Sequence, residues 1–149
     1  MTQRIVGYHH VNQNIGKEHV DAVRRFYKDV LGLEQVSSAQ QDPSGERLMW
    51  FALGNGQLHL NMAGKTDPPS SRHFAVLVRD FDGLIRHLDA NSVRMEECEP
   101  GQFWGRRPNG LKYAFCYDPV GNRIELMENP GNSSSEVQIP ELRPKERGL

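Results

Sequence analysis

The chain has 149 residues, the usual size of one domain and enough to bury a hydrophobic core. Its 18 basic and 19 acidic side chains give a formal charge of −1, which excludes the basic surface that nucleic acids or anionic membranes require. No stretch approaches the ~18 apolar residues of a membrane span or resembles a signal peptide, and two cysteines are too few for a disulfide framework. We therefore expect a protein of the reducing cytoplasm that binds neither nucleic acid nor membrane.

The first half of the chain has the order strand, helix and three further strands. Residues 4–14 have the character of a strand. From residue 20, apolar side chains recur every three or four positions as far as Gly32, which is typical of an amphipathic helix that ends at a glycine. Turn residues then separate three predicted strands, at 33–39, 47–53 and 57–62.

The second half repeats this order after a proline- and serine-rich connector at 65–71. Residues 73–78 are a predicted strand and 82–90 a predicted helix, and three more strands are predicted, at 93–97, 112–118 and 122–128. The chain is therefore expected to be an internal duplication with a period of about seventy residues. The tail, 130–149, has little apolar content and is expected to be extended or disordered.

Overlaying the two halves brings potential metal ligands to matched positions. The stretch YHHVNQNI falls on SRHFAVLV, which places His10 over His73, and GQLHL falls on NRIEL, which places His59 over Glu125. His10 and His59 are 49 residues apart, and His73 and Glu125 are 52 apart. If the first and last strands of each half are neighbours, the four side chains can converge.

Three imidazoles and one carboxylate are a suitable ligand set for one divalent transition metal, because imidazole binds Zn, Ni, Cu or Fe well and a carboxylate adds an anionic oxygen. A single histidine in a strand is more often structural than a ligand, and Glu125 alone is also compatible with a side chain that faces solvent. The match of four such residues across two repeats favours a metal site, and the expected ion is Zn, Ni, Mn or Fe.

Three stretches of the sequence are similar to a known family: HHV followed by RRFYKDVLGL, then HFAVLVRDFDGL, and then YAFCYDPVGNRIELME. They resemble the vicinal oxygen chelate superfamily, which includes glyoxalase I, methylmalonyl-CoA epimerase, extradiol dioxygenases, fosfomycin-resistance proteins and bleomycin-resistance proteins. The resemblance implies an α+β fold of paired βαβββ modules, about 4–64 and 71–129, in a single domain at 1–129. Their mixed sheets would form an open cup around a metal, often with both modules contributed across a homodimer.

The family's ligand positions match His10, His73 and Glu125, and His59 fills the remaining one. That position holds glutamate in glyoxalase I and glutamine in the epimerase, and it supplies no ligand in fosfomycin-resistance enzymes. The resemblance implies a lyase or isomerase like glyoxalase I, in which the metal binds two adjacent oxygens of a small substrate and stabilises an enediolate. Glu125 matches the carboxylate that moves the proton in glyoxalase I, so it is the expected catalytic residue.

Three alternatives from the same superfamily stay open. An extradiol dioxygenase would use His10, His73 and Glu125 as a facial triad, but Lys112 and Phe115 stand about where those enzymes carry an extra histidine and a tyrosine. A thiol transferase of the fosfomycin-resistance type would be expected to show a potassium-loop signature, which we do not find in the sequence. A drug-sequestering protein of the bleomycin-resistance type generally lacks the metal ligands, whereas this chain has all four positions filled.

Five polar residues are predicted to bind the substrate: three asparagines that share a strand face with His10 or His59, and two loop arginines suited to a carboxylate or phosphate. They are Asn12, Asn14, Asn61, Arg106 and Arg107. The structural alternatives are asparagines that pair with one another and arginines that are solvated. His9 is expected to point to the opposite face of a regular strand and is left out of the site, as are His19 and His87 on helices.

The expected partners are a small-molecule substrate and a second copy of the chain, with a thiol cosubstrate left open. A homodimer is expected because a cup whose sheets end in exposed edges is usefully covered by a second copy.

Overall fold

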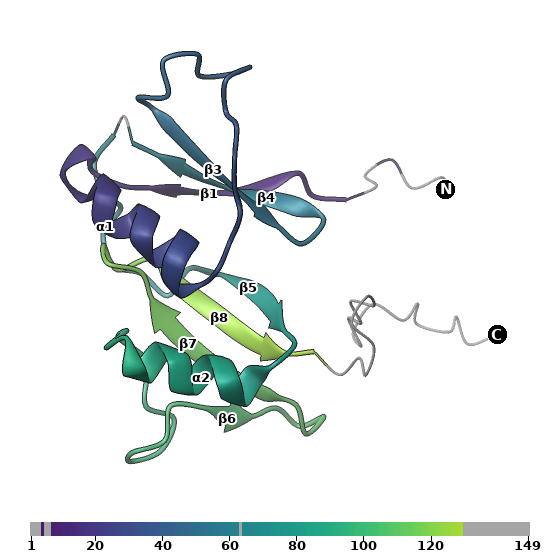
Figure 1. The fold of residues 1–149 in the computed structure, drawn as a ribbon. Coiled ribbons are helices and arrows are strands. Elements are labelled where there is room, and N and C mark those ends of the chain that lie inside the picture. The colour runs from purple at the N-terminus through teal and green to yellow at the C-terminus, as the bar shows by residue number, and fades with distance from the viewer. Residues whose placement is uncertain (1–3, 5–6, 63, 130–149) are drawn as a thin grey trace.

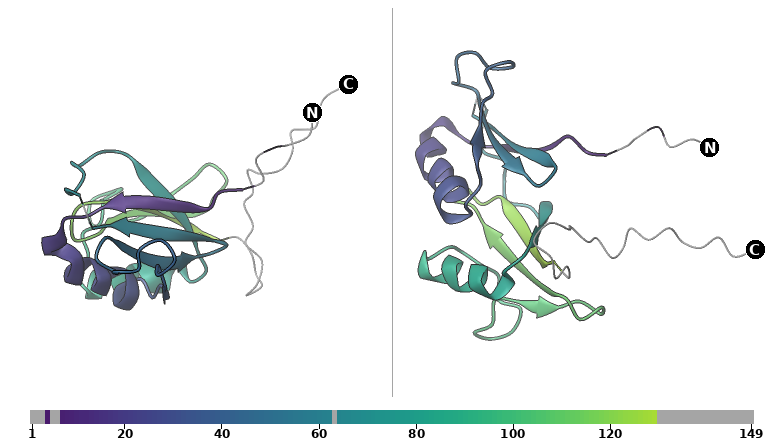
Figure 2. Two further views of the ribbon diagram at one scale, coloured as in Figure 1. Left: turned by 90° about the horizontal axis from the view of Figure 1, so that it is seen from above. Right: turned by 45° about the vertical axis from the view of Figure 1, so that its right-hand side comes forward.

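The computed structural model describes residues 4, 7–62 and 64–129. These residues form two modules, and each module has a four-stranded mixed sheet with a helical segment packed against it (Figure 1). Both helical segments lie on the same side of the two sheets (Figure 2). This is the α+β architecture predicted from the sequence. Among the described residues, no helix is long and apolar enough to cross a membrane, and the predicted tail at 130–149 lies outside them.

The first module pairs its first strand with its last. Its elements in chain order are β1 (His10–Asn14), the 3₁₀ turn η1 (Lys17–His19), α1 (Val20–Arg25), the π-helical turn η2 (Phe26–Val30), β2 (Gln35–Val36), β3 (Leu48–Leu53) and β4 (Gly56–Asn61). The strands lie in the order β1-β4-β3-β2, with β1 parallel to β4 and the other pairs antiparallel. The helical segment ends before Gly32, as predicted, because a φ of +71° there suits only glycine well.

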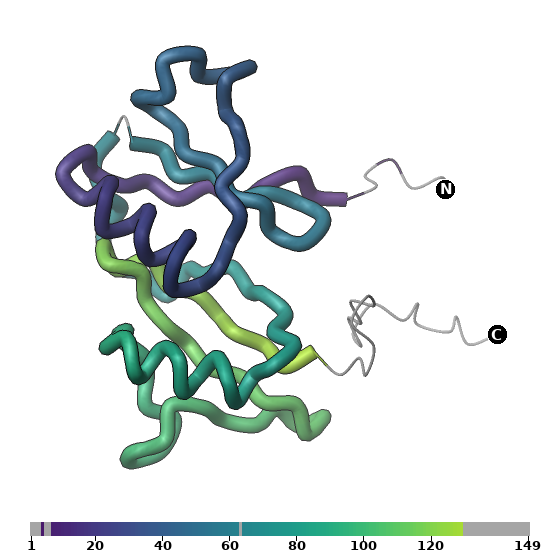
Figure 3. Tube along the Cα trace, viewed as in Figure 1, coloured from purple at the N-terminus to yellow at the C-terminus, as the bar shows by residue number. Residues whose placement is uncertain are grey.

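The second module repeats this topology. Its elements are β5 (His73–Val78), α2 (Phe81–Ala90), β6 (Gly105–Arg106), β7 (Lys112–Tyr117) and β8 (Arg123–Glu128). The strands lie in the order β5-β8-β7-β6, with β5 parallel to β8. Asp80 caps α2 by accepting a hydrogen bond from the Gly83 N–H at 3.0 Å. The course of the chain from β4 to β5, which joins the modules, can be followed in Figure 3.

The pairing register is also the same in both modules. In each, the first residue of the first strand lies opposite the residue two positions before the second predicted ligand: the pairs are His10 opposite Gln57, and His73 opposite Arg123. Side chains alternate along a strand, so His59 lies on the same face as Gln57, and Glu125 lies on the same face as Arg123. The duplication seen in the sequence is therefore present in the backbone.

One hydrophobic core joins the modules. Buried helical side chains from both of them contribute to it: Val23, Phe26, Tyr27, Phe81 and Leu88. The Tyr27 hydroxyl donates a hydrogen bond of 3.0 Å to Oδ2 of Asp118, which lies in the turn between β7 and β8. Burial, and then the Asp118 carboxylate, raise the pKa of Tyr27 well above its ordinary value of 10.0. This contact ties the first helical segment to the second sheet.

Two strands of the first module are shorter than predicted. In the described part of segment 4–14, β1 begins only at His10, which lies opposite Gln57. Its partner strand β4 begins at Gly56, and the Gln57 N–H donates to the His9 carbonyl at this end of the pair. In segment 33–39, only Gln35–Val36 is a strand. The chain turns away at Ser38, whose carbonyl accepts from two backbone N–H groups.

One strand of the second module lies elsewhere than predicted. Segment 93–97 is not a strand, although Met95 forms a single bridge with Cys116 of β7. After that bridge the chain leaves the sheet for a turn at 99–102, and it returns to β7 as β6, between the predicted strands 93–97 and 112–118. The edge of β7 is thus shared between two short contacts, the Met95 bridge and β6.

Candidate metal centre

The four predicted ligands form two pairs, one on each sheet. The rings of His10 and His59 are stacked, with centroids 4.0 Å apart and planes at 11°. His73 Nε2 lies 3.1 Å from Glu125 Oε2. Among the described residues, one group of three or more possible ligands gathers within 4.8 Å, and it does not combine the two pairs. The chain by itself therefore brings its predicted ligands together two by two.

His9 belongs to the first pair's surroundings, contrary to the prediction that it points away. Its Nδ1 lies 3.0 Å from Nδ1 of His10, and the group of possible ligands is His9, His10 and His59. The prediction was wrong because it assumed a regular strand through His9, whereas β1 begins one residue later. The sequence feature that could have indicated a role for His9 is its position directly before His10.

The environment of His59 keeps its ring neutral. The ring is 5% exposed and lies between the ring of His10 and the indole of Trp50, which is 4.1 Å away and parallel to within 3°. Desolvation, followed by the neighbouring His10 and His9, lowers the pKa of His59 from 6.5 to about 4. Its Nε2 bonds to Oε1 of Gln57 at 2.9 Å. A neutral ring held through one nitrogen is the form that ligates a metal through the other.

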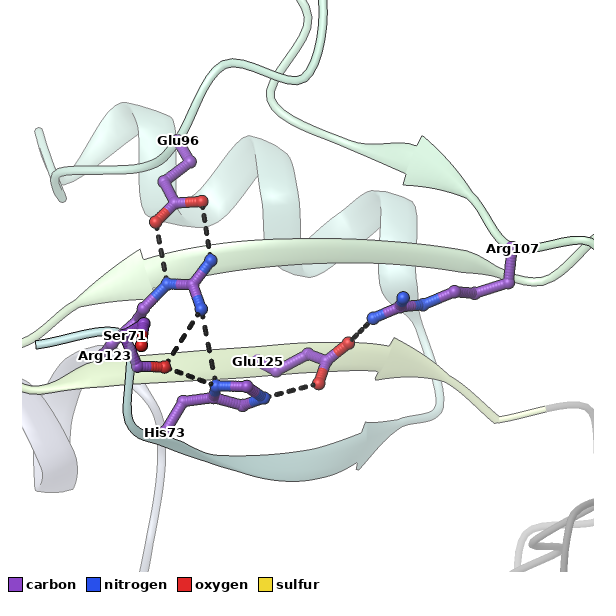
Figure 4. Close-up of polar contacts among 6 residues, drawn as sticks. All are labelled: Ser71, His73, Glu96, Arg107, Arg123 and Glu125. Atoms are coloured by element: carbon purple, nitrogen blue, oxygen red, sulfur yellow. Dashed lines mark hydrogen bonds and ion pairs between the residues drawn. The ribbon is translucent and has the colours of Figure 1, made fainter.

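The second pair is a charged network (Figure 4). Glu125 is 6% exposed; its Oε2 faces His73 Nε2, and its Oε1 accepts a hydrogen bond from Nη2 of Arg107. Nδ1 of His73 lies 3.0 Å from the Ser71 carbonyl. A ring that donates from Nδ1 directs the lone pair of Nε2 at the carboxylate oxygen, and a cation shared by these two atoms resolves the repulsion. The donor set therefore fits a divalent metal.

Only one of the two predicted loop arginines lies at this network. The guanidinium of Arg107 lies over the ring of Tyr113 at 4.2 Å and bonds to Glu125. Arg106 instead donates to the carbonyl of Gly110 at 2.7 Å. Glu125 and Arg107 line a cleft of about 410 Å³, so the carboxylate is buried but reachable.

Arg123 is a site residue that the sequence reasoning missed. It forms a two-pronged ion pair with Glu96, at 2.7 and 2.9 Å, and its guanidinium lies 3.5 Å from the ring centroid of Phe115. Its Nη1 is 3.4 Å from His73 Nδ1 (Figure 4). The overlay of the two halves could have indicated Arg123, because it occupies beside Glu125 the place that Gln57 has beside His59.

Two of the three predicted asparagines line a larger cleft, of about 720 Å³, between β1 and the start of β5. Asn12 donates to Oδ1 of Asn14 at 3.4 Å, and Asn14 donates to the carboxylate of Asp67 at 3.0 and 3.1 Å. His73 lines the same cleft. Asn61 ends β4, opposite Asn14 in the register.

The family model of the Glyoxalase/Bleomycin resistance protein/Dioxygenase superfamily matches residues 7–126. The chain belongs to this superfamily. The resemblance carried by the HHV, HFAVLV and DPVGNRIEL stretches is thereby confirmed. The superfamily contains metal-dependent enzymes that act on small molecules.

Individual relatives are distant in sequence. The uncharacterized protein YaeR of Escherichia coli strain K12 is 27% identical over 114 residues, which are 70% of this chain and 84% of YaeR. A glyoxalase family protein from Bacillus anthracis superposes with a TM-score of 0.73 at 25% identity, covering 86% of this chain and 98% of its own.

Two further solved structures share the fold at lower identity. Lactoylglutathione lyase from Agrobacterium tumefaciens has a TM-score of 0.64 and 22% identity, with 85% of this chain and 96% of its own covered. The fosfomycin resistance protein FosX from Listeria monocytogenes has a TM-score of 0.66 and 15% identity, with 83% and 91% covered.

Proposed function

We propose that the chain is a metal-dependent lyase or isomerase of the glyoxalase I type, which acts on a small molecule with vicinal oxygens. The observation that carries the proposal is the environment of Glu125. This buried carboxylate faces a histidine nitrogen on one side and an arginine on the other, and it lines a cleft. A carboxylate so placed is suited both to bind a metal and to move a proton.

One divalent ion, Zn, Ni, Mn or Fe, is the expected cofactor. We propose that His10, His59, His73 and Glu125 hold it when the two pairs meet in a homodimer. In the described chain β1 and β5 each have one hydrogen-bonded neighbour, so both sheets present an edge that a second copy can cover. When bound, the ion would supply Lewis-acid stabilisation of the negative charge that develops on the substrate oxygens.

The chain's own residues would then bind, orient and deprotonate the substrate. Glu125 would take the proton from the carbon beside the carbonyl and return it to the neighbouring carbon, which leaves the overall composition of the substrate unchanged. Arg107 is placed to hold an anionic group of the substrate, since its fork can bind a carboxylate once Glu125 turns to the metal. The Ser71 carbonyl would keep His73 in the orientation that ligation needs.

The contacts of Lys112 and Phe115 favour the lyase over the dioxygenase. Lys112 Nζ is bonded to both carboxylate oxygens of Asp82, at 2.7 and 2.8 Å, away from Glu125. Phe115 packs edge-on against the His73 ring and offers no proton. Neither residue supplies the acid or base for which a ring-cleaving enzyme uses histidine and tyrosine.

The test is the Glu125→Gln variant, with Glu128→Gln on the same strand as the matched control. The first substrate is the hemithioacetal of methylglyoxal and glutathione, whose isomerisation gives the lactoylglutathione named for the Agrobacterium relative. Loss of the base should lower kcat about 10²–10⁴-fold, whereas Glu128→Gln should stay near the wild type because an amide oxygen still accepts from the Lys112 N–H. Full activity of Glu125→Gln would remove Glu125 from the mechanism.

A further inference from the structure

We propose that His9, His10 and His59 form a metal site within a single chain, with His9 as a ligand, for a nitrogen-preferring divalent ion such as Zn²⁺, Ni²⁺ or Cu²⁺. This site needs neither His73 nor Glu125. It shares His10 and His59 with the proposed centre, but metal binding by the three histidines can be tested without the proposed reaction, and it assigns a role to His9, the histidine of the cluster that strand alternation excludes.

The separations of the ring nitrogens support coordination. The possible ligand atoms of the three rings all lie within 4.8 Å of one another. His9 Nδ1 and His10 Nδ1 are 3.0 Å apart. Two nitrogens bound to one ion at ~2.1 Å lie roughly 3.0 Å apart when the bonds are at right angles and roughly 3.4 Å apart in a tetrahedral site.

The chemistry of the cluster selects the class of ion. Among the described residues the group contains three imidazoles and no carboxylate. Neutral nitrogen donors favour Zn²⁺, Ni²⁺ and Cu²⁺ over Mg²⁺ and Ca²⁺, which require oxygen ligands. Gln57 already bonds to Nε2 of His59, so its Nδ1 is the nitrogen left for a metal.

A buried donor beside the cluster lacks a partner. Within the described part of the chain, Trp50 Nε1 is the only buried side-chain nitrogen or oxygen with no hydrogen bond. The indole is 7% exposed and stacks on the His59 ring. Such orphan donors are rare in folded proteins, and an oxygen ligand carried on the ion is an acceptor that would satisfy this one.

Binding requires one ring movement, and this movement supplies a signal. His10 and His59 are parallel to within 11°, so one ion cannot lie in both ring planes until one ring turns. His9 already stands edge-on to both, at 88° and 82°. Rotation of an imidazole about χ2 is a soft motion. Because Trp50 stacks on His59, metal binding should change the fluorescence of Trp50.

The experiment uses the full chain with His73→Gln and Glu125→Gln, which removes the second pair, and with Trp104→Phe, which leaves Trp50 as the sole tryptophan. Zn²⁺ and Ni²⁺ are titrated by calorimetry and by fluorescence. We expect one ion per chain, a Kd independent of protein concentration, and no response to Mg²⁺. His9→Gln should weaken binding about tenfold or more. His19→Gln, at a half-exposed histidine outside the cluster, should not.

A ligand is separated from a residue that merely orients His10 by electron paramagnetic resonance of the Cu²⁺-loaded protein. The hyperfine pattern should show three nitrogens and should fall to two in His9→Gln. Two nitrogens in both proteins, or an unchanged Kd in His9→Gln, would overturn the proposal. If the background variant does not fold, the same comparison is made with Glu125→Gln alone. If Glu125→Gln loses turnover but still binds metal in a way that depends on His9, the metal site is supported separately from the proposed function.

Discussion

The two modules have the same strand order and register, yet they carry opposite chemistry at matched positions. The last strand of the first module holds His59 opposite Trp50, and that of the second holds Glu125 opposite Phe115. The His59 ring lies flat against an indole among neutral groups. The Glu125 carboxylate lies next to the guanidinium of Arg107.

The difference shows how a duplicated frame can place two chemically different side chains at matched positions. The strand order and register set where His59 and Glu125 lie, and the side chains around each of them determine which charge state is favoured. An apolar, aromatic pocket favours a neutral imidazole, because desolvation penalises its protonated form. The flanking guanidinium of Arg107 balances a carboxylate that would otherwise be costly to bury.

The largest effect is expected from breaking this division with His59→Glu, which gives the first module the carboxylate of the second without its arginine. A carboxylate would then be buried against Trp50 with no guanidinium beside it. We expect a loss of about 3 kcal/mol or more of unfolding free energy. Urea denaturation of the metal-free protein measures it, with His59→Gln as the uncharged control. Equal stability of the two variants would show that the first module also supplies a cation.

A somewhat smaller effect is expected at the turn that precedes the last strand of the second module. The second module's turn contains the buried Asp118, which accepts hydrogen bonds from the Tyr27 hydroxyl and from two groups of Asn122. Asp118→Ala leaves these donors unpaired and should cost about 2–3 kcal/mol, whereas Tyr27→Phe removes one bond and should cost about 1 kcal/mol. Equal losses in chemical denaturation would mean that the Tyr27 contact accounts for the whole effect.

Acid should reveal the neutral imidazole of the first module. His59 has a pKa of about 4 in the folded chain against an ordinary 6.5, so between these values the unfolded chain binds a proton that the folded chain does not. This contribution is therefore fully present above pH 6.5 and is lost as the pH falls toward 4, by on the order of 3 kcal/mol. Unfolding of the metal-free protein at both ends of this window, compared with His59→Gln, measures it. The same pH dependence in both proteins would contradict the assignment.

The sequence predicted the features that depend on order and alternation. The matched places of His10 and His73, and of His59 and Glu125, followed from two repeats with a strand period of two, and the register bears this out. His9 escaped prediction because the start of β1 depends on where the parallel strand β4 starts to pair with it, which is a tertiary event.

The remaining site residues depend on loop paths and on strand partners. Arg107 reaches Glu125 from a loop eighteen residues earlier, and no local pattern distinguishes it from Arg106, which turns elsewhere. The two-residue strand β6 exists only because β7 offers it an edge. Such contacts are set by the folded sheet, so they lie beyond what periodicity can indicate.

The smallest effect is expected from making the aromatic partners alike with Trp50→Phe, since Phe115 holds the matched place. Replacing a buried indole by a smaller ring usually costs stability through lost packing. Here the substitution also removes an N–H group that is buried without a partner, and burying such a group costs about 1–3 kcal/mol. The two contributions oppose each other, so the net change should stay within about 1 kcal/mol. A loss above 3 kcal/mol in urea denaturation would show that the indole N–H is hydrogen-bonded in solution, and the first module would then hold a bound acceptor even without metal.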